Sequence, residues 1–161
     1  MKIENKKEVI IVKKTVVVIA LIIMIMALMF ILTGCTSSIS YTYKVTTGDT
    51  IQIKLNNSDG YDITSEVPFK ITKADTTISQ GTFITLDGYE QYIATVNSTS
   101  TSKVIDKGSK NGIEYTFYSY NGQEFNYIIK VEGSKTGILI GNAISEESAK
   151  ECFERLTFSK Q

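Results

Sequence analysis

The first 35 residues differ in pattern from the rest of the chain. Lysines up to Lys14 precede an unbroken apolar run from Val16 to Leu32. As a helix, these 17 residues would span about 25 Å, which is close to the minimum for crossing a bilayer. A basic stretch followed by such a run is typical of a secretory signal whose lysines stay on the cytoplasmic side. We therefore expect an N-terminal signal helix.

Strands are predicted where apolar and polar residues alternate. In 50–55, Ile51, Ile53 and Leu55 share one face and polar residues occupy the other, as in a strand with one buried face. The segment 41–45 alternates in the same way, and we expect it to pair with 50–55 across a turn. Further strands are predicted over 69–73, 82–86, 137–141 and 156–158.

Two segments have apolar residues at the spacing of one helix face. A short helix is expected over 87–96, with a face formed by Tyr89, Tyr92, Ile93 and Val96. A second helix is expected to begin after Ser145, a suitable N-cap that is followed by two glutamates. The apolar face of that segment carries Ala149, Cys152, Phe153 and Leu156. The small polar residues of 97–102 predict an exposed loop.

The segment 113–131 predicts a β-hairpin and allows two registers to be compared. If the Asn-Gly pair at 121–122 forms a two-residue type I′ turn, Tyr118 pairs with Phe125, and both faces mix polar and apolar residues. If a three-residue loop with a bulge begins one residue earlier, Phe117 pairs with Phe125, and one face is wholly apolar. We expect the second register, because a shift of one residue moves every side chain to the other face.

These elements together predict an α+β fold. It would consist mainly of an antiparallel β-sheet with about two helices packed on it. Beyond residue 40 there is no Pro-rich linker, long run of charge or internal repeat, so we expect a single domain over 41–161, which is an ordinary domain size.

Four residues that follow the apolar run suggest how the chain is anchored. Leu32, Thr33, Gly34 and Cys35 resemble a bacterial lipobox, in which the cysteine receives a diacylglyceryl group before cleavage on its N-terminal side. The resemblance implies a lipoprotein signal peptide over 1–34, and a lipidated Cys35 with a short tether over 35–40. It also implies lipid anchoring at the outer, extracytoplasmic face of the cell membrane. The alternative is a retained signal-anchor helix with an unmodified Cys35.

Net charge and cysteine count have to be considered separately for residues 1–34 and for the remainder of the chain. Residues 1–34 carry a net charge of +3 and the remainder −3, although the sum is zero. Without a basic cluster, nucleic acid is not an expected partner. If Cys35 carries lipid, Cys152 is the only thiol of the mature domain, and its place on an apolar helix face predicts a buried, unreactive cysteine.

The chain contains no histidine. This absence excludes Ser-His-Asp and Cys-His catalysis and histidine-ligated zinc. We expect no catalytic residues, no metal site and no cofactor. Fifteen carboxylates follow residue 34, and they leave open one alternative, a carboxylate-dependent hydrolase of the cell envelope.

Aromatic side chains are the main chemical resource of the domain. Fifteen follow Cys35, and nine of these are tyrosines. Most are expected to lie in the core or in cross-strand pairs. Tyr118 and Tyr120 fall on or beside the polar face of the predicted hairpin, so they are the candidate contact surface.

The order of elements from Thr50 to Phe158 resembles that of the PsbP-like α/β/α sandwich family. The resemblance rests on the strand 51–55, the helix 89–96, the hairpin 114–131 and the helix that begins near Ser145. The family includes a subunit of the oxygen-evolving photosystem, a nuclear import factor that binds the Ran GTPase, and small bacterial lipoproteins. It has no shared catalytic set, so the resemblance implies a non-enzymatic binding or assembly module.

The sequence therefore predicts a lipid-anchored, extracytoplasmic module of the cell envelope that is not an enzyme. Its partners would be the membrane, through the lipid on Cys35, and an envelope protein. A third possibility is that the cleaved leader peptide is itself the product.

Overall fold

The structure is a computed structural model that describes residues 37–161. The chain divides into two compact units, 1–35 and 36–161, and the fold below is that of the second. The predicted signal peptide and lipobox, with Leu32, Thr33, Gly34 and Cys35, lie outside the described residues. Within 37–161, none of the helices is both long enough and apolar enough to cross a bilayer.

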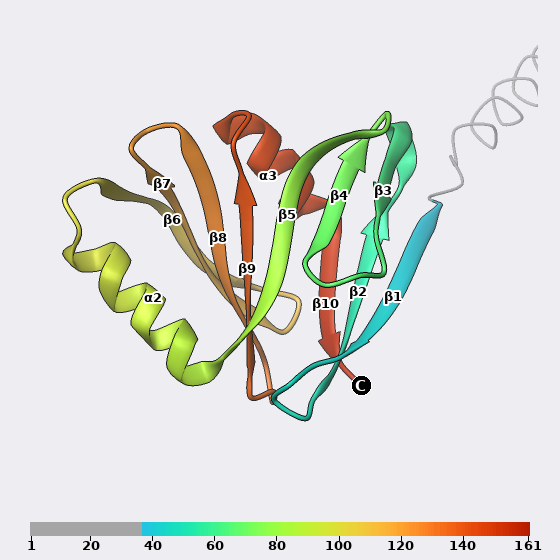
Figure 1. The fold of residues 1–161 in the computed structure, drawn as a ribbon, viewed down its shortest axis with the longest axis horizontal. Helices are drawn as coiled ribbons and strands as arrows, with labels where there is room; N and C mark the ends of the chain where they lie inside the picture. Colours follow the sequence, from blue (N-terminus) through green and yellow to red (C-terminus); the bar gives the residue numbers. More distant parts are fainter. Residues whose placement is uncertain (1–36) are drawn as a thin grey trace, which may run out of the picture. The chain divides into compact units, whose positions relative to one another are not determined.

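Two antiparallel sheets and two α-helices make up the described part of the chain (Figure 1). In chain order the elements are β1 (Ser38–Lys44), β2 (Thr50–Asn56), the 3-10 turn η1 (Ser58–Gly60), β3 (Tyr61–Ile63), β4 (Phe69–Lys73), β5 (Thr76–Thr85), α2 (Leu86–Ser98), β6 (Ser102–Lys110), β7 (Ile113–Tyr120), β8 (Glu124–Val131), β9 (Thr136–Asn142), α3 (Glu146–Glu154) and β10 (Leu156–Lys160). The prediction of an α+β fold with a mainly antiparallel sheet and two helices is confirmed.

The large sheet has the order β3-β4-β5-β9-β8-β7-β6, and the small one β1-β2-β10. The two helices lie on opposite faces of the large sheet. Phe153 of α3 stacks on Tyr127 at 4.0 Å between ring centroids. Ile138 lies on the same face as Tyr127, whereas its neighbour Gly137 meets Tyr89 of α2 on the other face. The small sheet shares the α3 side.

The main core fills the space between the small sheet, α3 and the large sheet. Tyr43 of β1 packs on Phe69 and Phe83, with ring centroids 5.9 and 5.1 Å away. The alternation in β2 is confirmed, because Ile51 and its apolar neighbours on that strand are fully buried. Full burial of such side chains contributes roughly 1.5–3 kcal/mol each, which explains how a three-stranded sheet is held on the larger one.

The register predicted for the β7–β8 hairpin is wrong. Phe117 pairs with Tyr127 and not with Phe125, a shift of two residues. The loop comprises Asn121, Gly122 and Gln123, and the first two have positive φ values of 52° and 68°. The turn thus contains a type I′-like Asn-Gly pair with one additional residue. Because a shift of two preserves alternation, the predicted apolar and polar faces are nevertheless retained.

Element boundaries also differ from those expected. β1 begins at Ser38, inside the segment 35–40 that was expected to be a tether. α2 begins at Leu86, so the strand expected over 82–86 ends one residue earlier, and α2 continues into the expected loop 97–102. β3 and β6 were not predicted. β6 is largely exposed and lacks an alternating apolar pattern, which is why its sequence gives no strand signal.

Candidate functional site

The position of α2 is fixed at its beginning and along its packed face. Thr85 ends β5 and caps the helix, since its hydroxyl accepts a hydrogen bond from the backbone nitrogen of Gly88 at 3.1 Å. Under the first turns, a Cβ atom on Gly137 would lie only 3.0 Å from Ile84 and 3.1 Å from Tyr89. The missing side chain at this position lets α2 approach the sheet closely.

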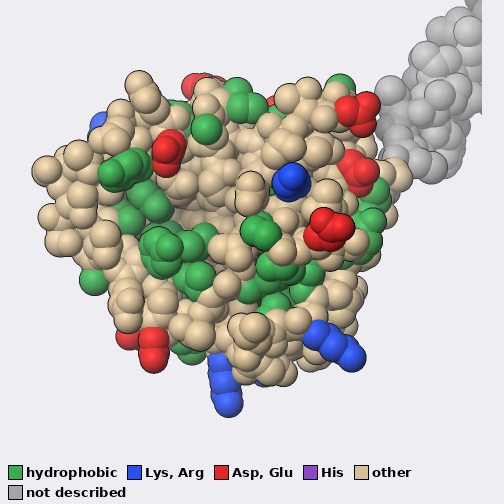
Figure 2. All heavy atoms as spheres, in the orientation of Figure 1, with side chains coloured by type: hydrophobic (Ala, Val, Ile, Leu, Met, Phe, Trp, Pro, Cys, Tyr) green, Lys and Arg blue, Asp and Glu red, His purple; other side chains and the backbone are tan. Residues whose placement is uncertain are grey.

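A groove remains beside the second half of α2, over one end of β6, β7 and β8. It has a volume of about 430 Å³. We call it the tyrosine groove, and its lining residues are Tyr92, Thr95, Val96, Thr99, Ser102, Tyr118, Tyr120, Glu124 and Asn126. Figure 2 shows hydrophobic side chains gathered on the side of the molecule where α2 lies.

The β7–β8 ladder determines which side chains reach the groove. Tyr118 pairs with Asn126 and Tyr120 with Glu124. Residues two apart on a strand share a face, and so do paired residues, so these four side chains project on the α2 side of the sheet. Tyr92 reaches the groove from the helix. Its side chain is 43% exposed and that of Tyr120 38%, which leaves two aromatic rings accessible to a ligand.

The lining of the groove carries negative charge and no positive charge. Glu124 is its only charged lining residue, and no lysine or arginine lines it. The ion pairs found within 37–161 use other carboxylates, those of Asp49, Asp59, Glu146, Glu151 and Glu154. The carboxylate of Glu124 therefore has no basic partner within this part of the chain.

The phenol group of Tyr118 stays protonated and can donate a hydrogen bond. Burial, together with the nearby Tyr92 and Glu124, raises the pKa of Tyr118 above the usual value of a phenol. Elsewhere in the domain, Tyr43 donates to the carbonyl oxygen of Thr64 and Tyr115 donates to Asp106. Within residues 37–161 no such bond is found for the hydroxyl groups of the three groove tyrosines, which are available to a ligand.

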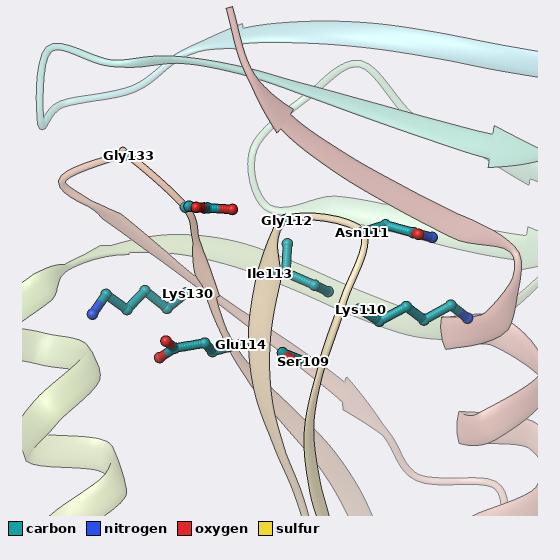
Figure 3. Close-up of a pocket in the computed structure, with 9 residues that line it drawn as sticks. Ser109, Lys110, Asn111, Gly112, Ile113, Glu114, Lys130 and Gly133 are labelled. Carbon is teal, nitrogen blue, oxygen red and sulfur yellow. The ribbon is translucent and has the colours of Figure 1, made fainter.

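A second pocket, of about 490 Å³, lies at the other end of β6 and β7. It contains two carboxylates, Glu114 and Glu132, with Lys110 and Lys130. Figure 3 shows the side chains of Glu114 and Lys130 extending to the same side, whereas Lys110 extends away from them. Glu114 and Lys130 are direct cross-strand partners, and Lys110 is paired with Glu154. Among these four charged side chains, only Lys110 forms an ion pair found within residues 37–161, and that pair draws it away from Glu114 and Lys130.

A third hollow lies at the beginning of α3, beside the exposed Ile144. The hydroxyl of Ser145 accepts a hydrogen bond from the nitrogen of Ser148 at 3.1 Å, so the cap already satisfies a first-turn amide. The next two residues, Glu146 and Glu147, are acidic. Such a helix end disfavours anions, and nothing else in this hollow selects a ligand.

Two residues that the sequence singles out line the groove. Tyr118 and Tyr120, the expected contact surface, lie together in it. Tyr92 was placed on the buried helix face, but it lies at the edge of that face and is exposed. The residue type itself indicates this exposure, because a tyrosine at the margin of an apolar helix face keeps its hydroxyl in water.

The cysteine and the possible metal-ligating side chains do not form a second candidate site within the described residues. Cys152 is 1% exposed, as predicted, and burial raises the pKa of its thiol to about 11. Within residues 37–161, no group of three or more carboxylate and cysteine side chains could hold a metal ion.

Comparisons with protein-family models, with curated proteins and with solved structures give no match to this chain.

Proposed function

We propose that the chain is a lipid-anchored binding module at the outer face of the cell membrane, and that the tyrosine groove is its binding site. One observation carries the second part. Three tyrosines from α2 and β7 meet in one groove, where two of their rings are accessible and their hydroxyls are unbonded within the described residues. Tyrosine combines a large apolar ring with a polar tip, and it is enriched at binding surfaces for this reason.

The proposed anchor rests on the lipobox resemblance of Leu32 to Cys35. Two acyl chains on Cys35 would give stable attachment, whereas one chain binds reversibly. β1 begins at Ser38, only three residues later, so the first strand would start within about 11 Å of the lipidated residue. In Figure 1, α2 lies on the opposite side of the domain from β1. A ligand in the groove would therefore lie on the side of the domain away from β1.

The proposed partner is an envelope protein or other envelope component, and not a nucleic acid. The net charge of −3 after residue 34 and the single carboxylate of the groove would repel a phosphate backbone. The resemblance of the element order to PsbP-like domains agrees with a binding role. A helix on each face of the large sheet supports that resemblance.

A hydrolase is the second candidate, because Glu114 and Glu132 line one pocket. A carboxyl group that acts as a general acid needs surroundings that keep its proton at neutral pH, usually burial. Both glutamates are exposed, and Glu114 faces Lys130 across the ladder. The binding role is therefore favoured. Hydrolysis of an envelope polymer that Glu114→Gln abolishes would reverse this preference.

Site-specific photocrosslinking in native membranes tests the groove. A photoreactive phenylalanine analogue is placed at position 92 or 120 of the full chain, and at the exposed positions 67 and 144 as controls. We expect one defined adduct from the groove positions that the control positions do not give. Adducts of equal pattern at all four positions, or none at 92 and 120, would contradict the proposed site.

A further inference from the structure

We propose that the tyrosine groove binds an organic ammonium cation, namely a small solute with an alkylated ammonium group. This inference rests on the groove being the binding site. The positive group would lie against the rings of Tyr92, Tyr118 and Tyr120, with Glu124 at its edge. Three aromatic rings and one carboxylate, with no basic residue, form the set that recognises such cations.

Charge selects this ligand class over the others. An anionic ligand would meet Glu124 and find no lysine or arginine in the lining. A neutral sugar could stack on the rings and donate hydroxyl hydrogens to Glu124, but only a cation gains a charge–charge attraction to that carboxylate. Glu124 lies opposite Tyr120 in the β7–β8 ladder, and no ion pair is found for it within residues 37–161. The groove therefore presents a carboxylate that a bound cation would neutralise.

The domain itself shows how its tyrosine rings hold cations. At Tyr61 the guanidinium carbon of Arg155 lies 4.1 Å from the ring centroid, and the Nζ atom of Lys73 lies 4.9 Å from it. Glu151 pairs with both of these cations. That cluster combines aromatic ring, carboxylate and cation within one structure. The tyrosine groove has the first two, and among residues 37–161 no lysine or arginine supplies the third.

The surroundings of the groove strengthen the attraction. Val96 is buried and lines the groove together with the three rings, so a bound cation would exchange part of its hydration for apolar surface. The interaction of a cation with aromatic rings increases as the cation is desolvated. The hydroxyl of Tyr118 keeps its proton at physiological pH, since a phenol titrates only near pH ~10 and burial raises this pKa further.

The test uses choline and its neutral carbon isostere, 3,3-dimethyl-1-butanol, with the full chain in maltoside micelles. Binding is measured by isothermal titration, and by saturation transfer to the ligand methyl protons. We expect choline to bind about tenfold more tightly than the isostere. Glycine betaine carries a carboxylate that Glu124 would repel, so it should bind more weakly than choline. Equal affinity of choline and the isostere would overturn the inference.

Matched variants assign the binding to the groove. Glu124→Gln keeps the shape of the side chain and should weaken choline about fivefold to tenfold without affecting the isostere. Tyr120→Leu should weaken choline by a similar factor. Glu66→Gln, an exposed glutamate between β3 and β4, is the control and should change nothing. Choline binding that resists both groove variants would overturn the assignment.

Two further outcomes separate this inference from the proposed function. If choline does not bind but photocrosslinks still form at positions 92 and 120, the ligand class is wrong and the binding site stands. If neither is observed, both proposals fail. Phosphatidylcholine vesicles distinguish the source of the cation, because binding to them without binding to soluble choline would contradict a small solute.

Discussion

Phe69 lies over Gly81 so closely that a Cβ atom on Gly81 would come within 2.1 Å of the ring carbon Cζ. The two residues are partners in the β4–β5 ladder, and Phe69 is fully buried. The ring thus occupies the place of the missing side chain. Neither residue has room to move, since Tyr43 and Phe83 pack on the same ring.

Gly81→Ala should therefore destabilise the domain by about 1–3 kcal/mol, the usual cost of overpacking a core. Urea unfolding followed by circular dichroism measures the loss. Phe69→Leu is the compensating change, because it removes the atoms that the new methyl group meets. The double variant should be less destabilised than the sum of the two single variants. Additive losses would show that this contact does not limit the packing.

Asp49 should make stability depend on pH in the acidic range. It is buried, and its Oδ2 atom accepts hydrogen bonds from the Lys135 nitrogen at 2.6 Å and the Thr136 hydroxyl at 2.9 Å. Burial alone would raise its pKa, but these bonds and Lys160 more than offset that effect and hold the pKa below the usual range. The folded state therefore favours the charged form.

The lowered pKa determines how the free energy of unfolding changes with pH. The stabilisation is fully present above the unfolded pKa of about 4 and is lost as the pH falls through the folded pKa. Asp49→Asn should lower the free energy of unfolding at pH 7 by about 1–3 kcal/mol and should flatten its decline in acid. Denaturant unfolding between pH 7 and pH 2 measures this, with Asp75→Asn in an exposed turn as control. Parallel pH profiles for the wild type and Asp49→Asn would contradict it.

Cys152 should not react with thiol reagents in the folded protein. Its side chain is buried, and burial raises its pKa to about 11, so almost no thiolate is present at pH 8. Labelling with a chromogenic disulfide should require unfolding. Ser65→Cys places a thiol at an exposed position and should react at once. Rapid labelling of Cys152 in the wild type under native conditions would be inconsistent with the structure.

The N-terminus of the mature protein should be a lipidated Cys35. Mass spectrometry of detergent-extracted protein should show a chain that begins at this residue and carries acyl chains. Cys35→Ser should prevent this modification. An intact Met1 terminus in the wild type would support the retained signal-anchor helix instead.

The sequence predicts which side chains of a strand face the core better than it predicts the register in which two strands pair. In the β7–β8 hairpin, alternation places Phe117 in the core and Tyr118 on the other face, and both are found there. It does not distinguish registers that differ by two residues, because both bury the same side chains. That choice is made by the loop geometry at Asn121 and Gly122, where both residues take positive φ values.

The groove was predictable only in part, for a related reason. A hairpin pattern identifies Tyr118 and Tyr120 as residues of one face, but it contains nothing about what lies opposite them. That depends on where α2 crosses the sheet, which is set by a contact between Tyr89 and Gly137, distant in sequence. Tyr92 enters the site through this crossing.

The polar character of β6 has a consequence for a crowded surface. β6 is an outer strand of the large sheet, and it carries Lys103, Lys107 and Lys110, with a register shift between Val104 and Asp106. Copies held at a membrane, as proposed, would meet one another far more often than copies in solution. Lysines and a bulge on an open edge oppose strand-to-strand joining. The residues that conceal β6 from sequence-based prediction are thus the ones that would keep neighbouring copies from fusing into a shared sheet.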